Sequence, residues 1–223
     1  MLSASSGQWI EWGVRGPVSG AAIGEFNAPL GVAFDASGNL YVADTANHRV
    51  QKLTKSTGEW SAIGRSDGQS GGALGEFYSP YGVAVDGSGN VYVVDRGNQR
   101  IQILSASTGE WSAWGTPGTA LGQFRNPAGV AVDGSGNVYV ADQSNNRIQK
   151  RSSADGSWSL FAGPGAGVGQ VYSPAAVAVD SQGNLYVAEP NFHRVQRWTA
   201  STGEWTEWKK DGGGAGDGAG EFN

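Results

Sequence analysis

The chain has 223 residues, of which 37 are glycine and none is cysteine, and its formal net charge is −5. The lack of cysteine excludes a disulfide framework and a cysteine-ligated metal site, and the negative charge disfavours nucleic acid and anionic membranes as partners. No apolar stretch approaches the ~18 residues of a transmembrane helix, and residues 1–13 lack the charged and apolar regions of a signal peptide. The sequence therefore assigns no localisation.

Four copies of one pattern organise most of the chain. Residues 1–13 come first and contain "SASSGQWIEWG", which matches "SASTGEWSAWG" at residues 105–115 and predicts one isolated strand. Full copies, such as "GVAFDASGNLYVADTANHRVQKL", then begin at Gly31, Gly82, Gly129 and Ala176, in steps of 51, 47 and 47 residues. Periods of this length are typical of propellers and solenoids.

Each copy predicts four short antiparallel strands. In the first copy these strands are "GVAFD", "NLYVAD", "RVQKL" and "WSAIG", separated by tight turns such as "DASG" and "STGE". Asp and Gly suit such turns because Asp bonds to its own backbone and Gly adopts positive φ. No segment shows a sustained 3.6-residue period, so we expect essentially no helix. The predicted fold class is all-β, a single β-propeller domain of four-stranded antiparallel blades.

The predicted blades leave a ring that is incomplete within one chain. They cover approximately residues 29–64, 80–115, 127–163 and 174–209. Residues 1–13 add a spare outer strand, and residues 210–223 read as a Gly-rich linker to a missing blade, since the final "GEFN" repeats residues 24–27. Five outer strands are therefore expected for four sets of inner strands, and each outer strand carries a tryptophan: Trp9, Trp60, Trp111, Trp158 and Trp205.

The repeated columns resemble the NHL repeat. The resemblance is carried by Pro-x-Gly at Pro29, Pro80 and Pro127, by an Asp-x-x-Gly-Asn turn, by a Tyr-Val-Ala-Asp strand, and by Asn-x-Arg-[Val/Ile]-Gln, as in "ADTANHRVQ". It implies a propeller, and a full ring of six blades. NHL propellers include lyases, sensor domains, RNA-binding modules and scaffolds, so the resemblance singles out no function.

An open ring would expose two apolar blade faces. Exposed patches of this kind mark interaction sites, so we expect a homo-oligomer, with a dimer favoured, that closes a toroid through these faces. The incomplete ring fits a segment of a longer propeller or a natural short form that assembles. The high similarity among the blades also fits recent blade amplification or an engineered fragment.

An acidic residue in each blade is followed five positions later by arginine. One interpretation is an acid/base or anion site, and the other is a structural ion pair that braces the hairpin. We favour structural pairs, because a catalytic site needs only one copy. The pairs are Asp44–Arg49, Asp95–Arg100, Asp142–Arg147 and Glu189–Arg194.

Two further columns are also expected to be structural. The aspartates of the first turn offer two or three oxygens, whereas calcium takes about 6–8, so we expect turn capping by Asp35, Asp86, Asp133 and Asp180. The apolar residues of the linkers are expected to wedge between neighbouring blades: Phe26, Phe77, Phe124, Val171 and Phe222.

The chain has two histidines, His48 and His193, and both directly precede the arginine of the pair in their blade. Propeller lyases use clustered histidines, often around a metal. Two histidines on separate blades with no third make a poor zinc site. We therefore expect no metal, no cofactor and no catalytic residue.

The ligand face, if one exists, is expected where the loops after the second strands meet the linkers between blades. Loop candidates are His48, Asn98, Asn145 and His193. Linker candidates are Leu30, Tyr78, Tyr81, Arg125 and Tyr172.

Three functions remain open at this point. The first is a non-enzymatic binding or scaffold propeller with a protein or peptide ligand, favoured because near-identical blades leave little room for a unique active site. The second is a metal-dependent lyase or hydrolase. The third is an RNA- or peptide-binding NHL module; the negative net charge disfavours RNA.

Overall fold

The computed structural model describes residues 20–209. The isolated strand expected at residues 1–13, with Trp9, and the linker expected at residues 210–223, with Phe222, lie outside the described residues. The described part forms sixteen strands in four antiparallel sheets of four strands each. Within it, no helix has the length and apolar character needed to cross a membrane.

Each sheet is one blade, and its strands follow one another in chain order. Blade 1 consists of β1 (Pro29–Phe34), β2 (Leu40–Asp44), β3 (Arg49–Thr54) and β4 (Glu59–Gly64). Blade 2 consists of β5 (Pro80–Val85), β6 (Val91–Asp95), β7 (Arg100–Leu104) and β8 (Trp111–Trp114). Blade 3 consists of β9 (Pro127–Val132), β10 (Val138–Asp142), β11 (Arg147–Arg151) and β12 (Trp158–Ala162). Blade 4 consists of β13 (Ala176–Val179), β14 (Leu185–Glu189), β15 (Arg194–Thr199) and β16 (Glu204–Lys209).

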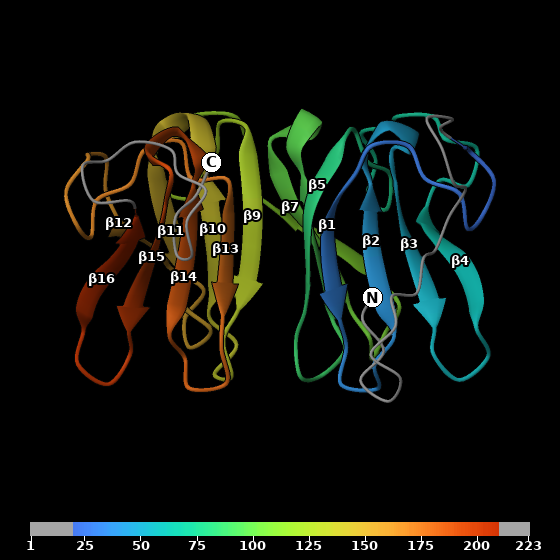
Figure 1. The fold of residues 1–223 in the computed structure, drawn as a ribbon. Coiled ribbons are helices and arrows are strands. Elements are labelled where there is room, and N and C mark those ends of the chain that lie inside the picture. The colour runs from blue at the N-terminus through green and yellow to red at the C-terminus, as the bar shows by residue number, and fades with distance from the viewer. Residues whose placement is uncertain (1–19, 210–223) are drawn as a thin grey trace.

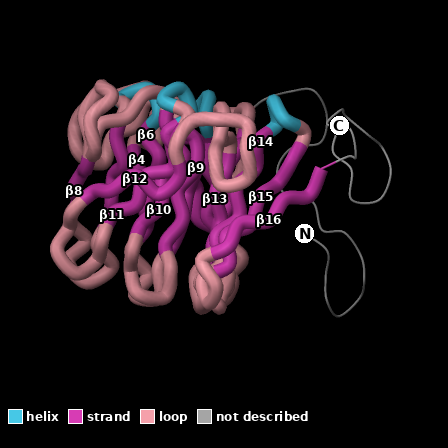
Figure 2. The backbone as a smooth tube through the Cα atoms, turned by 90° about the vertical axis from the view of Figure 1, so that its left-hand side faces the viewer, coloured by secondary structure: helices cyan, strands magenta, loops and turns pink. Residues whose placement is uncertain are grey.

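One-turn 3₁₀ helices connect the second and third strands of the blades, at the same end of the molecule (Figure 2). They are η1 (Thr45–Asn47), η2 (Arg96–Asn98), η3 (Gln143–Asn145) and η4 (Pro190–Phe192). Each is followed by a residue in the left-handed region, with φ of 52° at His48, 57° at Gln99, 52° at Asn146 and 49° at His193. The prediction of an all-β propeller with almost no helix is confirmed.

The blades stand side by side in chain order. The first strand of each blade lies near the middle in Figure 1, and β4, β12 and β16 lie at the periphery. Contacts link β1 with β5, β5 with β9, and β9 with β13, whereas no comparable contact joins β13 to β1 among the described residues.

Apolar side chains fill the space between neighbouring blades rather than a single centre. Phe77 and Phe124 are 0% exposed, and each meets an outer-strand tryptophan edge-on, with ring centroids 5.5 Å apart for Phe77–Trp111 and 5.3 Å apart for Phe124–Trp158. Val171 has the same place, 0% exposed, in the cluster between blades 3 and 4. The wedging expected of these three linker residues is confirmed.

Glycine in the innermost strands lets neighbouring blades approach closely. An ideal Cβ at Gly31 would lie 2.5 Å from the Tyr81 carbonyl oxygen, and one at Gly82 would lie 2.7 Å from the Ala128 carbonyl oxygen. A Cβ at Gly129 would meet the Val177 nitrogen at 2.8 Å. Real Cβ contacts to backbone atoms are longer than this, so the close approach requires glycine.

The aspartate after each first strand caps its own turn. Asp35 Oδ1 accepts the N–H groups of Ser37 and Asn39 at 3.0 and 2.9 Å, and its Oδ2 accepts Asn39 Nδ2 at 2.7 Å and the Tyr41 hydroxyl at 3.2 Å. Burial opposes ionisation of Asp35, but the bonds from Asn39, Tyr41 and Ser37 outweigh it and lower the carboxyl pKa. The same bonds recur at Asp86, Asp133 and Asp180, as expected from the sequence.

Candidate functional site

A polar cluster lies in each blade where the second strand ends and the third begins. In blade 2, Asp95 is the last residue of β6 and Arg100 is the first residue of β7, and the two are register partners across the hairpin. Asn98 lies in η2, and Gln102 shares a face of β7 with Arg100 because side chains alternate along a strand. We call Asp95, Asn98, Arg100 and Gln102 the linker clamp of blade 2.

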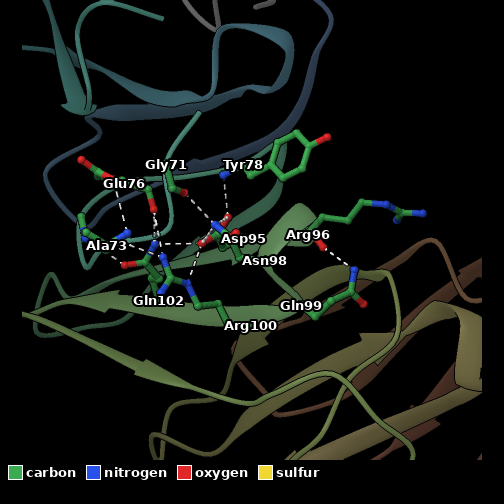
Figure 3. Close-up of polar contacts among 11 residues, drawn as sticks. Gly71, Ala73, Glu76, Tyr78, Asp95, Arg96, Asn98, Gln99, Arg100 and Gln102 are labelled. Carbon is green, nitrogen blue, oxygen red and sulfur yellow. Dashed lines mark hydrogen bonds and ion pairs between the residues drawn. The ribbon is translucent and has the colours of Figure 1, made fainter. Parts of the chain in front are cut away.

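The carboxylate at the centre of the linker clamp is buried and saturated with donors (Figure 3). Asp95 is 0% exposed. It accepts hydrogen bonds from the Tyr78 N–H at 2.8 Å, Asn98 Nδ2 at 2.9 Å, Arg100 Nε at 2.7 Å and Gln102 Nε2 at 3.0 Å. Donors from the fold therefore occupy the acceptor positions of this carboxylate.

The donors of the clamp also hold the linker that precedes blade 2. Arg100 Nη2 donates to the Ala73 carbonyl at 2.8 Å, and Gln102 Nε2 donates to the Glu76 carbonyl at 2.6 Å. Gln102 Oε1 accepts the Gly75 N–H at 2.9 Å. Side chains of the hairpin therefore satisfy backbone groups of an irregular segment, which would otherwise be costly to bury.

The carboxylate, arginine and glutamine of the clamp recur in all four blades, whereas the asparagine recurs in blades 1–3 and Phe192 takes its position in blade 4. The Nε to carboxylate distances are 2.8 Å for Arg49–Asp44, 2.7 Å for Arg100–Asp95, 2.7 Å for Arg147–Asp142 and 2.8 Å for Arg194–Glu189. All four carboxylate side chains are 0% exposed. The ion pairs expected from the sequence thus lie in contact, each within the hairpin of its own blade.

Two residues expected on the ligand face belong to these clamps. Asn98 Nδ2 donates to the Gly71 carbonyl at 2.8 Å as well as to Asp95. Asn145 Nδ2 donates to the Gly118 carbonyl and to Asp142, both at 2.9 Å. Both side-chain amides therefore bond to the interior of the fold.

The two histidines lie on blades 1 and 4, at the positive-φ position after η1 and η4. His48 Nδ1 accepts the Ser79 N–H of the next linker at 3.0 Å, and its ring meets the Tyr78 ring edge-on at 5.5 Å. Gln99 and Asn146 make the equivalent bond with Oε1 and Oδ1. Among residues 20–209, no group of three or more histidine or acidic side chains is placed to hold a metal ion.

The residues after each proline converge on a central cavity of about 300 Å³. Leu30, Tyr81, Ala128 and Ala175 line it together with the residues that follow them in the innermost strands. The structure therefore brings together Leu30 and Tyr81, which were both expected on the ligand face. The lining is apolar apart from backbone groups and the tyrosine hydroxyl, which suits a small apolar group.

Arg96 lies beside this cavity. Its guanidinium carbon is 4.6 Å from the centre of the Tyr81 ring, and its Nη2 donates to Gln143 Oε1 on blade 3 at 2.8 Å. Burial lowers the pKa of Arg96, partly offset by Tyr81. This contact connects η2 with η3 across the boundary between the two blades.

The remaining ligand-face candidates lie in the linkers. Tyr78 and Tyr172 are 49% and 46% exposed, and Tyr172 contacts Phe192 of η4 with ring centroids 5.5 Å apart. Arg125 lines a separate hollow of about 450 Å³ with Gln99. Linkers and short helices are joined by backbone bonds such as Gly97 N–H to the Tyr78 carbonyl at 2.7 Å. We call this surface, formed by η1–η4 and the adjoining linkers, the loop face.

The outermost described blades present uncovered apolar faces. A groove of about 410 Å³ on blade 1 is lined by Phe26, Pro29, Leu30, Val32, Phe34, Leu40, Val42 and Trp60. Val32 is 62% exposed, whereas its equivalents in the other blades are 5–9% exposed: Val83, Val130 and Val177. We call the side of a blade that packs on the preceding blade its leading face, and the opposite side its trailing face. The groove is the leading face of blade 1.

Sequence reasoning gave no role to the glutamine of each third strand. Gln51, Gln102, Gln149 and Gln196 are all 0% exposed, and each accepts an N–H from a linker glycine and donates to a linker carbonyl. The recurrence of this glutamine at one position in all four copies is the sequence signal that could have indicated its role. The partner atoms lie 26–27 residues away in the chain, so no local pattern identifies them.

Four sheets of this order, packed face to face, define a β-propeller. The family model of the NHL repeat matches residues 26–53, 77–104 and 124–150, each from a wedging phenylalanine into a third strand. The chain therefore contains three NHL repeats within a β-propeller fold.

Curated relatives share part of this chain. NHL repeat-containing protein 3 of Homo sapiens is 32% identical over 91 residues, which is 40% of this chain and 26% of the relative. Protein SUPPRESSOR OF QUENCHING 1, chloroplastic, of Arabidopsis thaliana is 30% identical over 86 residues, which is 37% of this chain and 8% of the relative. The chain thus spans about a quarter or less of the length of these relatives.

Solved structures share the fold. A streptogramin B lyase superposes with a TM-score of 0.60 at 20% identity, over 89% of this chain and 57% of the lyase. A catalytically inactive virginiamycin B lyase from Staphylococcus aureus, solved with quinupristin, gives 0.59 at 17% identity, over 81% of this chain and 55% of the lyase. At this level of identity the likeness shows the fold alone.

Proposed function

We propose that this chain is a non-enzymatic binding and scaffold module that self-assembles into a closed ring. Its carboxylate, arginine and glutamine side chains support a non-enzymatic role, because they recur in every blade and their hydrogen bonds hold the backbone of the linkers. A structural role in the blade requires the same side chains in all four blades, whereas a catalytic site requires only one copy that differs from the others.

The exposure of Val32 is the observation that best supports the proposed self-assembly. The valines equivalent to Val32 in blades 2–4 are 5–9% exposed, whereas Val32 itself is 62% exposed and lines an apolar groove. Covering such a side chain contributes about 1.5–3 kcal/mol, and apolar patches of this kind mark interaction surfaces. Assembly of chains end to end would cover it.

The loop face is the surface we assign to a protein or peptide ligand. It combines exposed aromatic side chains, Tyr78 and Tyr172, with the mouth of the central cavity beside Tyr81. Aromatic side chains next to an apolar cavity are typical of binding surfaces.

Light scattering coupled to size exclusion tests the assembly. The chain mass is 23.1 kDa, and we expect a single species at twice that value, because two chains would supply enough blades to close a ring. A monomeric mass at all concentrations would contradict the proposal. A mass that grows with concentration without reaching a plateau would contradict ring closure.

A metal-dependent lyase or hydrolase is the competing function. The solved structures named above include lyases, and His48 and His193 are the histidines that such a site would use. Elemental analysis of the purified protein by mass spectrometry decides between the two: stoichiometric metal that is lost in a His48→Ala variant would favour the enzyme. RNA binding, the third candidate, is tested by filter binding at low salt.

A further inference from the structure

The described blades form three junctions of one kind, and the two outermost faces carry residues equivalent to the two sides of such a junction. In each internal junction, the trailing face of one blade packs on the leading face of the next. Among residues 20–209, no further blade packs on the leading face of blade 1 or on the trailing face of blade 4. Each contact of an internal junction can therefore be compared with the two equivalent residues on these open faces.

The first pair of halves lies on the innermost strands. Ala33 packs against the cluster that contains Val83, and Ala131 shares a cluster with Val177. At the open ends, Ala178 holds the place of the alanine and Val32 holds the place of the valine, and both are exposed. The contact is apolar and closely matched in size, because the same two residue types make it internally.

The second pair lies on the outer strands. Phe161 on the trailing face of blade 3 meets Trp198 and Trp205 of blade 4, with ring centroids 5.0 and 6.0 Å apart. Trp208 has the position of Phe161 in blade 4 and is 42% exposed. Trp60 has the position of Trp205 in blade 1 and lines the open groove. An aromatic side chain on one face thus matches an aromatic groove on the other.

The third pair is a hydrogen bond on the loop face. His48 Nδ1 accepts the Ser79 N–H across the first junction, and Asn146 Oδ1 accepts the Ser173 N–H across the third. His193 is the equivalent acceptor in blade 4. The equivalent donor is the N–H of Ala28, an exposed residue with the same positive φ as Ser79, 49° against 51°.

One position departs from the internal pattern and sets the shape of the fourth junction. Ala176 replaces the glycine whose absent Cβ allows approaches of 2.5–2.8 Å at the internal junctions. Its methyl group holds a facing innermost strand further away. If the inner strands are spaced more widely while the outer strands stay in contact, the angle between the two blades becomes smaller. Blades that meet at a smaller angle close a larger ring.

From these observations we infer that a second copy of this chain docks head-to-tail, with the trailing face of its blade 4 on the leading face of blade 1. Val32 meets Ala178, Trp60 meets Trp208, and the Ala28 N–H bonds to His193, across a junction that is wider near the axis than the internal ones. This inference rests on the proposed self-assembly and specifies its interface. A head-to-tail contact of this kind is heterologous, and two such junctions close a ring when their rotations, added to those of the internal junctions, complete one turn.

Charge exchange tests the first pair. Val32→Glu and Ala178→Lys are made in separate chains, and because both sites are exposed the variants should fold. Each variant alone places an unpaired charge in both junctions, and we expect its dimer dissociation constant to rise about tenfold or more. An equal mixture should recover a dimer of one chain of each kind, because Glu then meets Lys in one junction and the other is wild type. Leu121→Glu, at a linker residue 53% exposed, is the control and should leave the dimer unchanged.

Cross-linking tests the same pair without charge. The chain has no cysteine, so a Val32→Cys, Ala178→Cys double variant treated with a short bismaleimide should give a covalent dimer. Ala33→Cys with Val83→Cys, at the equivalent internal junction, should cross-link within one chain. If the wild type is dimeric but the mixture does not recover and the covalent dimer does not form, the junction is wrong while self-assembly stands. If the wild type is monomeric, self-assembly fails and the junction fails with it.

Discussion

Replacing Asp142 with asparagine should strongly destabilise the fold, because the residue is the centre of a linker clamp. The carboxylate is 0% exposed and lies 2.7 Å from Arg147 Nε. It also accepts the Arg125 N–H at 2.8 Å and Gln149 Nε2 at 3.1 Å. An asparagine of the same size would present N–H groups where some of these donors now point, and it would leave the guanidinium of Arg147 buried without its counter-ion.

The size of the loss follows from the burial of the pair. Breaking a buried ion pair by removing one partner costs about 3–5 kcal/mol, because an uncompensated charge stays buried. Arg147 keeps bonds to the Thr119 and Ala120 carbonyls at 2.7 and 2.8 Å, which places the expected loss near the lower end, about 3 kcal/mol. With a urea m-value of about 2 kcal/mol/M, the midpoint falls by about 1.5 M.

Urea unfolding followed by tryptophan fluorescence, at one fixed protein concentration, measures this loss. Asp142→Glu is the matched control, because blade 4 uses Glu189 at this position with a similar contact to its arginine, 2.8 Å. This variant should lose less stability than the asparagine variant. Asp67→Asn, in an exposed ion pair with Arg65, should leave the midpoint unchanged. A loss below about 1 kcal/mol for Asp142→Asn would refute the argument that the clamp braces the blade.

Three further outcomes follow from particular residues. Ala176→Gly should weaken the dimer, measured as a higher dissociation constant, because it removes the methyl group that keeps the fourth junction wider near the axis. A dimer affinity that is unchanged or tighter would contradict this role of Ala176. Gly129→Ala should lower the unfolding midpoint, because its Cβ would lie 2.8 Å from the Val177 nitrogen. Burial, with the charge and hydrogen bond of Asp86, raises the pKa of Tyr92 to about 12. Stability from this raised pKa is complete below about pH 10, where tyrosine in the unfolded chain stays neutral, and is lost as the pH rises towards about 12. An absorbance titration should show a component near pH 12 that disappears in Tyr92→Phe.

The repeats made the fold predictable, because turn and strand residues recur at fixed offsets and each blade confirms the others. The same regularity indicated the ion pairs, since Asp95 and Arg100 are neighbours across one hairpin. It could not show that Asn98 bonds to the interior, because the direction of that amide depends on a linker that begins far earlier in the chain. The convergence of Leu30 and Tyr81 on one cavity likewise depends on how the blades are arranged around the axis.

The differences among the blades support the head-to-tail junction independently of the individual contacts. Val32 and Phe34 in blade 1 are as apolar as their equivalents in blades 2–4, although they are 62% and 46% exposed. The equivalents of Val32 are buried and those of Phe34 are partly buried. A sheet face that stays in water gains solubility from polar side chains, as alternating strands show, and these two positions do not show that pattern. The glycine of the innermost strands, in contrast, is replaced only at Ala176, where no described blade follows. A covered junction requires an apolar surface, which Val32 and Phe34 provide at one end. A junction that is wider near the axis requires a bulkier residue than glycine, which Ala176 provides at the other end.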